Sequence, residues 1–388
     1  MAKFDKQEKV LKQLSKSVSN QATLHQKNND ECYTRREDIA AELGRWSLLG
    51  KFEGKKIICP CDWDILEDED CFSITFDFEN GFQKPTVFKN KFYRMPKISY
   101  TLFDLLEADD KEVVEKNVEI PQEQVDEFLR NKVKCNFLRE LISIAKESGI
   151  KSITASGYDP KTDRGIKFQD VDYSKYDICI TNPPFSLMDE FVKTLLGNDY
   201  SQKKCEFIFL APFMDRVCPN IGLPLMLNKL YLGFGRHLGL TFDNFIDDSG
   251  IPKKKGVACD WIVSYPEAQD EVNKAANPPE LHYEDYKEDF QIFQDITMKD
   301  GTHPIKVTGN LFPTDYDGWM CGPINLLDRS LDTRKYEWYG TDYKGFYNSI
   351  HPELSPFAHK ASNEMMKING KQCFHGIIFR KKQNMGVK

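Results

Sequence analysis

Residues 176–196, with the sequence YDICITNPPFSLMDEFVKTLL, decide the fold class of this chain. Residues 176–181 are a short and mostly apolar run, which is typical of a strand buried in a parallel sheet. Pro183 and Pro184 end that strand, because proline lacks the backbone N–H that a central strand must donate. The residues after them place apolar side chains at helical spacing and stop at Gly197. The stretch therefore predicts a strand, a tight turn and a helix.

The same alternation of strand and helix continues on both sides of this stretch. We predict further strands at 55–62, 150–155, 207–211, 229–233 and 259–264, and helices at 35–49, 134–149 and 223–231. Such alternation favours an α/β fold with a mainly parallel sheet and helices on both faces. Residues 65–133 interrupt it with many acids and three prolines, so we expect an insertion that folds outward as a separate lobe.

The length of 388 residues predicts two or three domains. Residues 1–29 form a basic N-terminal segment whose apolar spacing predicts a short helix. Residues 30–266 carry the alternating elements together with the acidic insertion. Residues 267–388 mix aromatic and basic side chains with turn signals, which is typical of a recognition region built from loops and short elements.

The composition excludes several classes of protein. Hydrophobic residues make up 40% of the chain, enough apolar surface to exclude disorder over its whole length. No apolar stretch reaches the roughly 18 residues of a membrane-spanning helix, and the N-terminus lacks a signal peptide, so we expect a cytoplasmic protein. The eleven cysteines include no CxxC pair, which favours reduced, mostly buried thiols over disulfides or a zinc site.

The net charge of −7 argues against a nucleic-acid partner, but the distribution of charge does not. Residues 3–29 have a local charge of +4 and residues 360–388 one of +6. A phosphate backbone responds to the local field rather than to the total charge. Two interpretations stay open for these basic ends, namely contact with a nucleic acid and solvated tails.

The turn after the strand predicted at 176–181 carries the chemistry. Two prolines leave carbonyl oxygens free to point into a pocket, and Asn182 adds an amide oxygen beside them. Phe185 offers a flat apolar surface for stacking. An exocyclic amino group on a planar base requires such acceptors and such a surface. The alternative is a rigid turn in which Asn182 only caps the helix.

This motif resembles the catalytic motif of amino-directed methyltransferases that use S-adenosylmethionine. More specifically, the chain is similar to the EcoRI-type adenine-specific DNA methyltransferase family. The similar segments are DECYT at 30–34, CD at 61–62, NF at 136–137, ITNPPFSL at 180–187, the glycine-rich 232–240, SG at 249–250, CDW at 259–261 and YDGWMCGPINLL at 316–327. The chain departs from the family in its long insertion and in lacking an F-x-G-x-G loop after the first strand.

The resemblance implies a Rossmann-like methyltransferase fold with a C-terminal target-recognition region. It implies site-specific transfer of a methyl group from S-adenosylmethionine to N6 of a flipped adenine in double-stranded DNA, without a metal or a covalent intermediate. The catalytic residues would be Asn182, Pro183, Pro184 and Phe185, and the cofactor-binding residues Tyr33, Thr34, Asp62, Asn136, Phe137, Tyr158 and Asp170. Asp172 remains an alternative to Asp170 as the acid of a third strand.

For several of these residues a structural role is also open. Thr34 precedes a helix and has Glu37 three residues on, as in a capping box. Asp62 lies among other acids and is also compatible with a solvent-facing position. Tyr158 and Asp170 are also compatible with ordinary polar positions in loops.

Two lysine-rich clusters are predicted to contact DNA phosphates. Lys253, Lys254 and Lys255 are expected in a loop after Gly250, and Arg380, Lys381 and Lys382 lie near the C-terminus. The resemblance also leaves open a cognate restriction endonuclease in a restriction–modification system. Rival functions are methylation of RNA adenine or of a protein glutamine, and a DNA-binding relative without catalytic activity.

Overall fold

The computed structural model describes residues 34–63, 73–78, 84–88, 118–119, 133, 135–159, 164–236, 238–246, 252–276, 278, 280–329, 331–341, 353, 355–360, 366–374 and 376–382. The predicted basic helix of residues 1–29, Tyr33 and most of the insertion at 65–133 lie outside the described residues.

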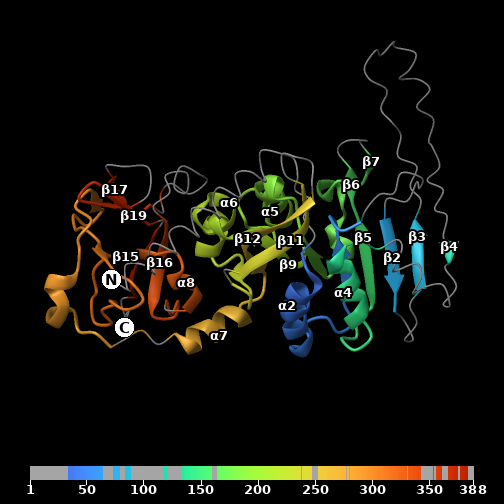
Figure 1. Cartoon of the computed structure of the whole chain (residues 1–388), viewed down its shortest axis with the longest axis horizontal. Coiled ribbons are helices and arrows are strands. Elements are labelled where there is room, and N and C mark those ends of the chain that lie inside the picture. The colour runs from blue at the N-terminus through green and yellow to red at the C-terminus, as the bar shows by residue number, and fades with distance from the viewer. Residues whose placement is uncertain are drawn as a thin grey trace, which may run out of the picture.

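A ten-stranded sheet organises the described chain, with the strand order β10-β12-β9-β8-β1-β5-β2-β3-β4 and with β11 paired to β12 (Figure 1). Its strands are β1 (Lys56–Cys59), β2 (Ser73–Asp77), β3 (Lys84–Phe88), β4 (Val118–Glu119), β5 (Ser152–Ser156), β8 (Ile178–Thr181), β9 (Glu206–Pro212), β10 (Tyr231–Leu232), β11 (Leu238–Ile246) and β12 (Pro252–Val263). Pairing is parallel through β9, β8, β1 and β5, and antiparallel strands extend the sheet on both sides. The predicted α/β fold is confirmed, with parallel pairing in its centre.

Helices α4 (Asn136–Ile144) and α5 (Met188–Leu196) lie in the two crossovers between parallel strands. The first crossover runs from β1 to β5 and the second from β8 to β9, in opposite directions along the sheet. Because such crossovers are right-handed, α4 and α5 pack on opposite faces. Helix α2 (Arg36–Leu48) contacts α4, and α6 (Pro219–Met226) contacts α5. The helix predicted at 223–231 begins earlier, at Pro219, a residue favoured in the first helical turn.

The acidic insertion departs from the predicted separate lobe. Its described strands β2, β3 and β4 continue the main sheet, and β2 pairs antiparallel with β5. Ile74 and Phe76 of β2 are fully buried, so the insertion adds to the core and covers what would otherwise be an exposed strand edge. Asp170 and Asp172 both lie outside the strands of the sheet. Asp170 is the last residue of the short 3-10 helix η2 (Phe168–Asp170), and Asp172 caps the start of η3 (Tyr173–Lys175).

The residues after α7 (Glu267–Ala275) form smaller sheets at the end of the molecule opposite to β2, β3 and β4 (Figure 1). A four-stranded sheet contains β14 (Ile305–Lys306), β15 (Met320–Pro323), β20 (Gly376–Lys381) and β16 (Tyr336–Thr341). Two-stranded sheets pair β13 (Ile296–Met298) with β17 (Phe357–Lys360) and β18 (Met366–Ile368) with β19 (Lys371–Phe374). The helical elements here are η6 (Tyr283–Asp289) and α8 (Leu326–Arg329).

Two general features of the described residues bear on the expectations from sequence. No described helix has the length and apolar character needed to cross a membrane. The nine described cysteines are all free thiols, and most of them are buried.

Candidate active site

The carboxyl ends of β1 and β8 meet at the point where the two crossovers diverge. Asp62 follows β1 after a two-residue turn, and Asn182 follows β8 directly. Ligands of open α/β sheets bind at such a switch point, beyond the carboxyl ends of the strands. The structure therefore brings together two predicted site residues that are 120 positions apart in the sequence.

Asp62 is a buried carboxylate, 5% exposed, rather than a solvent-facing acid. The hydroxyl of Thr181, the last residue of β8, donates to its Oδ2 atom. The thiol of Cys135, which precedes α4, donates to Oδ1 at 3.0 Å. Burial and the charge of Asp62 raise the pKa of the Cys135 thiol well above its ordinary value, so the thiol keeps the proton that it donates. The carboxylate is thus held from two different elements.

The ends of β1 and β5 approach each other closely beside Asp62. The backbone N–H groups of Asp62 and Trp63 both donate to the carbonyl of Ser156, at 3.2 and 3.3 Å. A Cβ atom at Gly157 would lie 2.1 Å from the carbonyl oxygen of Trp63, a distance that excludes any larger residue. The glycine therefore permits the contact that fixes the backbone at Asp62.

Thr34 and Asn136 lie next to each other, as expected for residues of one site. The side-chain amide of Asn136 donates to the carbonyl of Thr34 at 2.8 Å. No side-chain cap is formed at the start of α2, so the predicted capping box is absent there. Among the described residues, the buried hydroxyl oxygens of Thr34 and Ser156 have no hydrogen-bond partner. Buried hydroxyls normally have partners, so these two can take the polar groups of a ligand.

The remaining predicted cofactor contacts occupy three kinds of environment. Phe137 is 1% exposed and packs on Trp261 with ring centroids 5.4 Å apart, which is a core position. Tyr158 lies half-buried on β6 (Tyr158–Asp159), which pairs with β7 (Arg164–Gly165), and the Lys167 amino group lies 4.9 Å from its ring centroid. Asp170 is exposed at the end of η2.

The alternative to Asp170, Asp172, already has local contacts. Its side chain accepts hydrogen bonds from the backbone and the hydroxyl of Ser174, which lower the pKa of the carboxyl group. These contacts favour Asp170 as the acid that remains available to a ligand.

The residues of the turn after β8 differ in how exposed they are. Asn182 is half-buried and Pro183 is buried. Phe185 begins the short 3-10 helix η4 (Phe185–Leu187) and is 3% exposed, so its ring is packed in the core of the protein. Stacking of a base on this ring remains a prediction and requires the ring to become accessible.

A comparison with known protein families identifies the family to which this site belongs. The family model described as Adenine-specific methyltransferase EcoRI matches residues 20–242, more than half of the chain. The chain belongs to this family. The matched part contains Thr34, Asp62, Asn136 and Asn182. No curated protein and no solved structure matches the chain significantly. The protein is thus an adenine-specific methyltransferase, as the resemblance of its motifs indicates.

The first lysine cluster of the methyltransferase lies in a strand and not in the predicted loop. Lys253, Lys254 and Lys255 belong to β12, where Lys253 and Lys255 pair with Phe245 and Phe242 of β11. Cys259 of β12 opposes Pro212, the last residue of β9, so the residues before Cys259 extend past the end of β9. At about 3.3 Å per residue, Lys255 lies about 13 Å beyond it. The cluster is therefore on a two-stranded ribbon that projects from the edge carrying Asp62 and Asn182.

The second cluster of the methyltransferase is partly enclosed by its own region. The guanidinium of Arg380 lies 4.7 Å from the ring centroid of Trp319 and donates to the hydroxyl of Tyr339 at 2.8 Å. The Lys381 amino group lies 3.9 Å from Asp317. Lys382 is exposed. The three residues therefore differ in their capacity to contact phosphates.

Sequence reasoning missed a buried carboxylate that ties α2 to the sheet. Glu42 accepts hydrogen bonds from the indole of Trp46 and from the backbone N–H groups of Phe234 and Gly235. Burial raises the pKa of Glu42 above its ordinary value, against these hydrogen bonds. A Cβ atom at Gly233 would lie 2.4 Å from the Glu42 carboxylate. The glycine-rich segment at 232–240 is thus packed tightly against α2 and its carboxylate.

A buried charge network joins the sheet of the methyltransferase to its C-terminal region. Arg216, fully buried in η5 (Phe213–Val217), donates twice to Asp260 of β12 and once to Asp328 of α8. Burial alone would lower the pKa of Arg216, but Asp260 and Asp328 raise it above its ordinary value.

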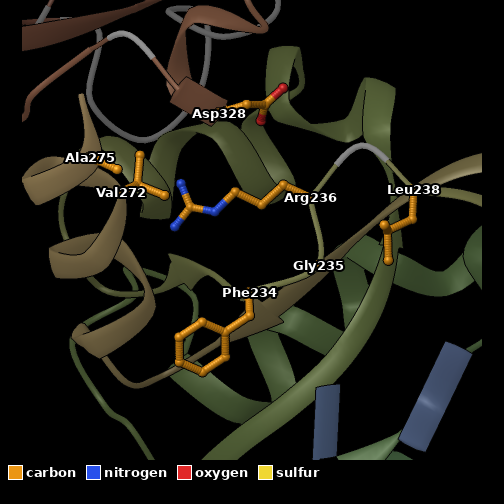
Figure 2. Close-up of a pocket in the computed structure, with 7 residues that line it drawn as sticks. All are labelled: Phe234, Gly235, Arg236, Leu238, Val272, Ala275 and Asp328. Atoms are coloured by element: carbon orange, nitrogen blue, oxygen red, sulfur yellow. The ribbon is translucent and has the colours of Figure 1, made fainter. Parts of the chain in front are cut away.

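Asp328 also borders a cavity of about 430 Å³ (Figure 2). Figure 2 shows the Arg236 side chain extending across this cavity toward Val272 and Ala275 of α7. Its guanidinium donates to the carbonyls of Leu232, Gly233, Ala268 and Leu327. Burial and the nearby Arg216 lower the pKa of Arg236 to about 10. The cavity contains none of the predicted site residues and is a junction between α7, α8 and the sheet edge.

Proposed function

We propose that the protein transfers a methyl group from S-adenosylmethionine to N6 of adenine in double-stranded DNA. The observation that carries this proposal is the contact between Asp62 and Thr181, which places a buried carboxylate beside the residue that precedes Asn182. A carboxylate is suited to the cationic end of the cofactor, and an amide oxygen to the amino group of the base. Membership of an adenine-specific methyltransferase family supports the same reaction.

The residues of the site fit S-adenosylmethionine. Asp62 would face its charged methionine end, and the hydroxyls of Thr34 and Ser156 would find partners in its polar groups. Tyr158 and Asp170 lie beyond β5, where we place the adenosine. The bound cofactor supplies an electrophilic methyl group on a sulfonium.

The residues after β8 would act on the base. The Asn182 amide oxygen and the Pro183 carbonyl would accept the two amino hydrogens of adenine and turn the nitrogen lone pair out of conjugation with the ring. The base must leave the duplex to reach these acceptors, and Phe185 would then stack on it. Positioning and electrostatic fit to the transition state would supply most of the rate enhancement.

The ribbon formed by β11 and β12 supports DNA as the substrate. It projects from the same edge as Asn182 and carries Lys253, Lys254 and Lys255. A two-stranded ribbon can lie in a major groove or along a phosphate backbone. We place the duplex across this edge, with residues 267–388 as the target-recognition region.

The proposal is tested by incubating the protein with methyl-labelled S-adenosylmethionine and with duplex DNA, single-stranded RNA or total protein in parallel. We expect label in DNA, at N6 of adenine and within one sequence context. Label in RNA or in protein glutamine would establish a rival function, and DNA binding without transfer would indicate an inactive relative. A cognate restriction endonuclease, where present, would cut unmethylated DNA and leave the methylated product intact.

A further inference from the structure

Thr181 connects the two halves of the proposed site. It is fully buried and is the last residue of β8, where its backbone lies opposite Phe209 of β9. Its hydroxyl donates to Oδ2 of Asp62, and the next residue is the proposed acceptor Asn182. One residue thus touches the carboxylate proposed for the cofactor and continues into the loop proposed for the base.

The hydroxyl fixes the direction in which Asp62 presents its charge. Asp62 follows the two-residue turn after β1, and a side chain there has several staggered rotamers open to it. Thr181 holds one carboxylate oxygen and Cys135 the other. A carboxylate oxygen can accept more than one hydrogen bond, so a contact from the protein does not by itself prevent a ligand from binding. The two contacts therefore orient the group.

A purely structural role is the competing explanation, because buried hydroxyls generally find an acceptor. Thr341 shows that case in the same protein. It is equally buried, and its hydroxyl donates to the backbone carbonyl of Val217 at 3.2 Å, outside the proposed site. Thr181 differs in that its acceptor is a side-chain carboxylate at the switch point of the sheet. The two threonines form a matched pair for an experiment.

We propose that Thr181 is a positioning residue for the cofactor, which orients the Asp62 carboxylate toward the methionine end of S-adenosylmethionine. This inference rests on the proposed function. The inference extends that function to Thr181, a residue that would touch neither the transferred methyl group nor the base.

The test compares Thr181→Val, which removes the hydroxyl and keeps the shape, with Thr181→Ser, which retains it. The dissociation constant of S-adenosylmethionine is measured by calorimetry on each full-length variant, and kcat at saturating cofactor by transfer to DNA. We expect Thr181→Val to weaken binding about tenfold or more, as for a lost hydrogen bond to a charged group. Its kcat should stay within about threefold of wild type, and Thr181→Ser should restore the affinity.

Two controls separate positioning from general destabilisation. Thr341→Val makes the same chemical change at an equally buried site and should leave cofactor affinity within about twofold, since distant sites act independently. Thr181→Ala serves as a second variant, because it avoids placing a methyl group against a carboxylate. Thermal melting without cofactor shows which variants are folded, and affinities are compared among those.

The inference is overturned if folded Thr181→Val and Thr181→Ala bind S-adenosylmethionine as tightly as wild type, or if Thr181→Ser binds as weakly as Thr181→Val. The proposed function fails in a different way. A wild-type protein that binds the cofactor and methylates no DNA would refute the DNA substrate while leaving the Thr181 comparison intact. A wild-type protein that does not bind the cofactor would refute both.

Discussion

The main sheet and the C-terminal region arrange their charged groups in opposite ways. At the carboxyl edge of the main sheet, Asp62 is buried, and its two oxygens are held by Thr181 and Cys135 in a place where unsatisfied hydroxyls also lie. In the C-terminal region, Arg380 is partly enclosed by Trp319 and Tyr339. In our proposal the first arrangement orients a charge toward the cofactor, whereas the contacts of Arg380 hold residues of its own region together. A basic residue near the C-terminus is therefore not by itself a phosphate contact.

The largest effect is expected from disrupting the buried charge network of Arg216, Asp260 and Asp328, which joins the two regions. Asp328→Ala removes one partner of the fully buried Arg216 and should lower the free energy of unfolding by about 3–5 kcal/mol. Asp317→Ala, at an exposed aspartate 3.9 Å from Lys381, should change it by less than about 1 kcal/mol. Urea unfolding of both variants makes the measurement. Equal small losses would mean that the two regions are not coupled through Arg216.

The next largest effect is expected from Asn182, the proposed hydrogen-bond acceptor after β8. Asn182→Ala should lower kcat by about 10²–10³-fold, the usual cost of removing one preorganised hydrogen-bonding group. The dissociation constant of S-adenosylmethionine should change little, because the lost amide serves the base. Asn198→Ala, at an exposed asparagine after α5, is the matched control and should retain wild-type rates. An Asn182→Ala enzyme with near-normal kcat would refute the proposed mechanism.

These two predictions differ in how far the sequence alone could have led to them. Asn182 follows a continuous apolar run and precedes two prolines, so the local sequence predicts both its strand and its turn. The contacts of Arg216 join residues 44 and 112 positions apart, and no local pattern marks such a pair. For the same reason the sequence does not predict the contact of Cys135 with Asp62, which joins residues 73 positions apart. Local periodicity predicts elements, whereas long-range side-chain contacts depend on how those elements pack.

Two elements show how pairing overrides local preference. Three successive lysines after Gly250 favour a loop, yet they lie in β12 because β11 pairs with it. The acidic stretch after Asp62 suggested a separate lobe, yet the buried SITF segment at 73–76 pairs with β5. In both cases the deciding partner is a distant strand, which composition does not reveal.

The burial of Phe185 leads to a smaller effect. Phe185→Leu keeps the apolar volume and removes the aromatic face, so kcat/KM for DNA should fall by an amount equivalent to about 1–3 kcal/mol. Stability should change by less than about 1.5 kcal/mol. Phe191→Leu, at a buried phenylalanine of α5 that packs on Phe168, controls for loss of a core ring. If both variants lower kcat/KM equally, Phe185 is a core residue and not a platform for the base.

The smallest effect tests the C-terminal charges one at a time. Each phosphate contact contributes about 0.9 to the slope of log affinity for DNA against log salt concentration. Lys382 is exposed, so Lys382→Gln should flatten the slope by about that amount if it contacts a phosphate. Arg380 has aromatic and hydroxyl partners within its own region, so Arg380→Gln should leave the slope unchanged and lower the stability of that region instead.

Fluorescence anisotropy with one duplex over a series of salt concentrations measures the slopes, and thermal melting measures the stabilities. A flatter slope for Arg380→Gln, without a loss of stability, would show that its guanidinium leaves Trp319 and Tyr339 to meet DNA. The contrast between a charge oriented toward the cofactor in the main sheet and a partly enclosed charge in the C-terminal region would then fail. Unchanged slopes for both variants would instead leave DNA contact to other surfaces, of which the ribbon carrying Lys253, Lys254 and Lys255 is the first to test, because it projects beside Asn182.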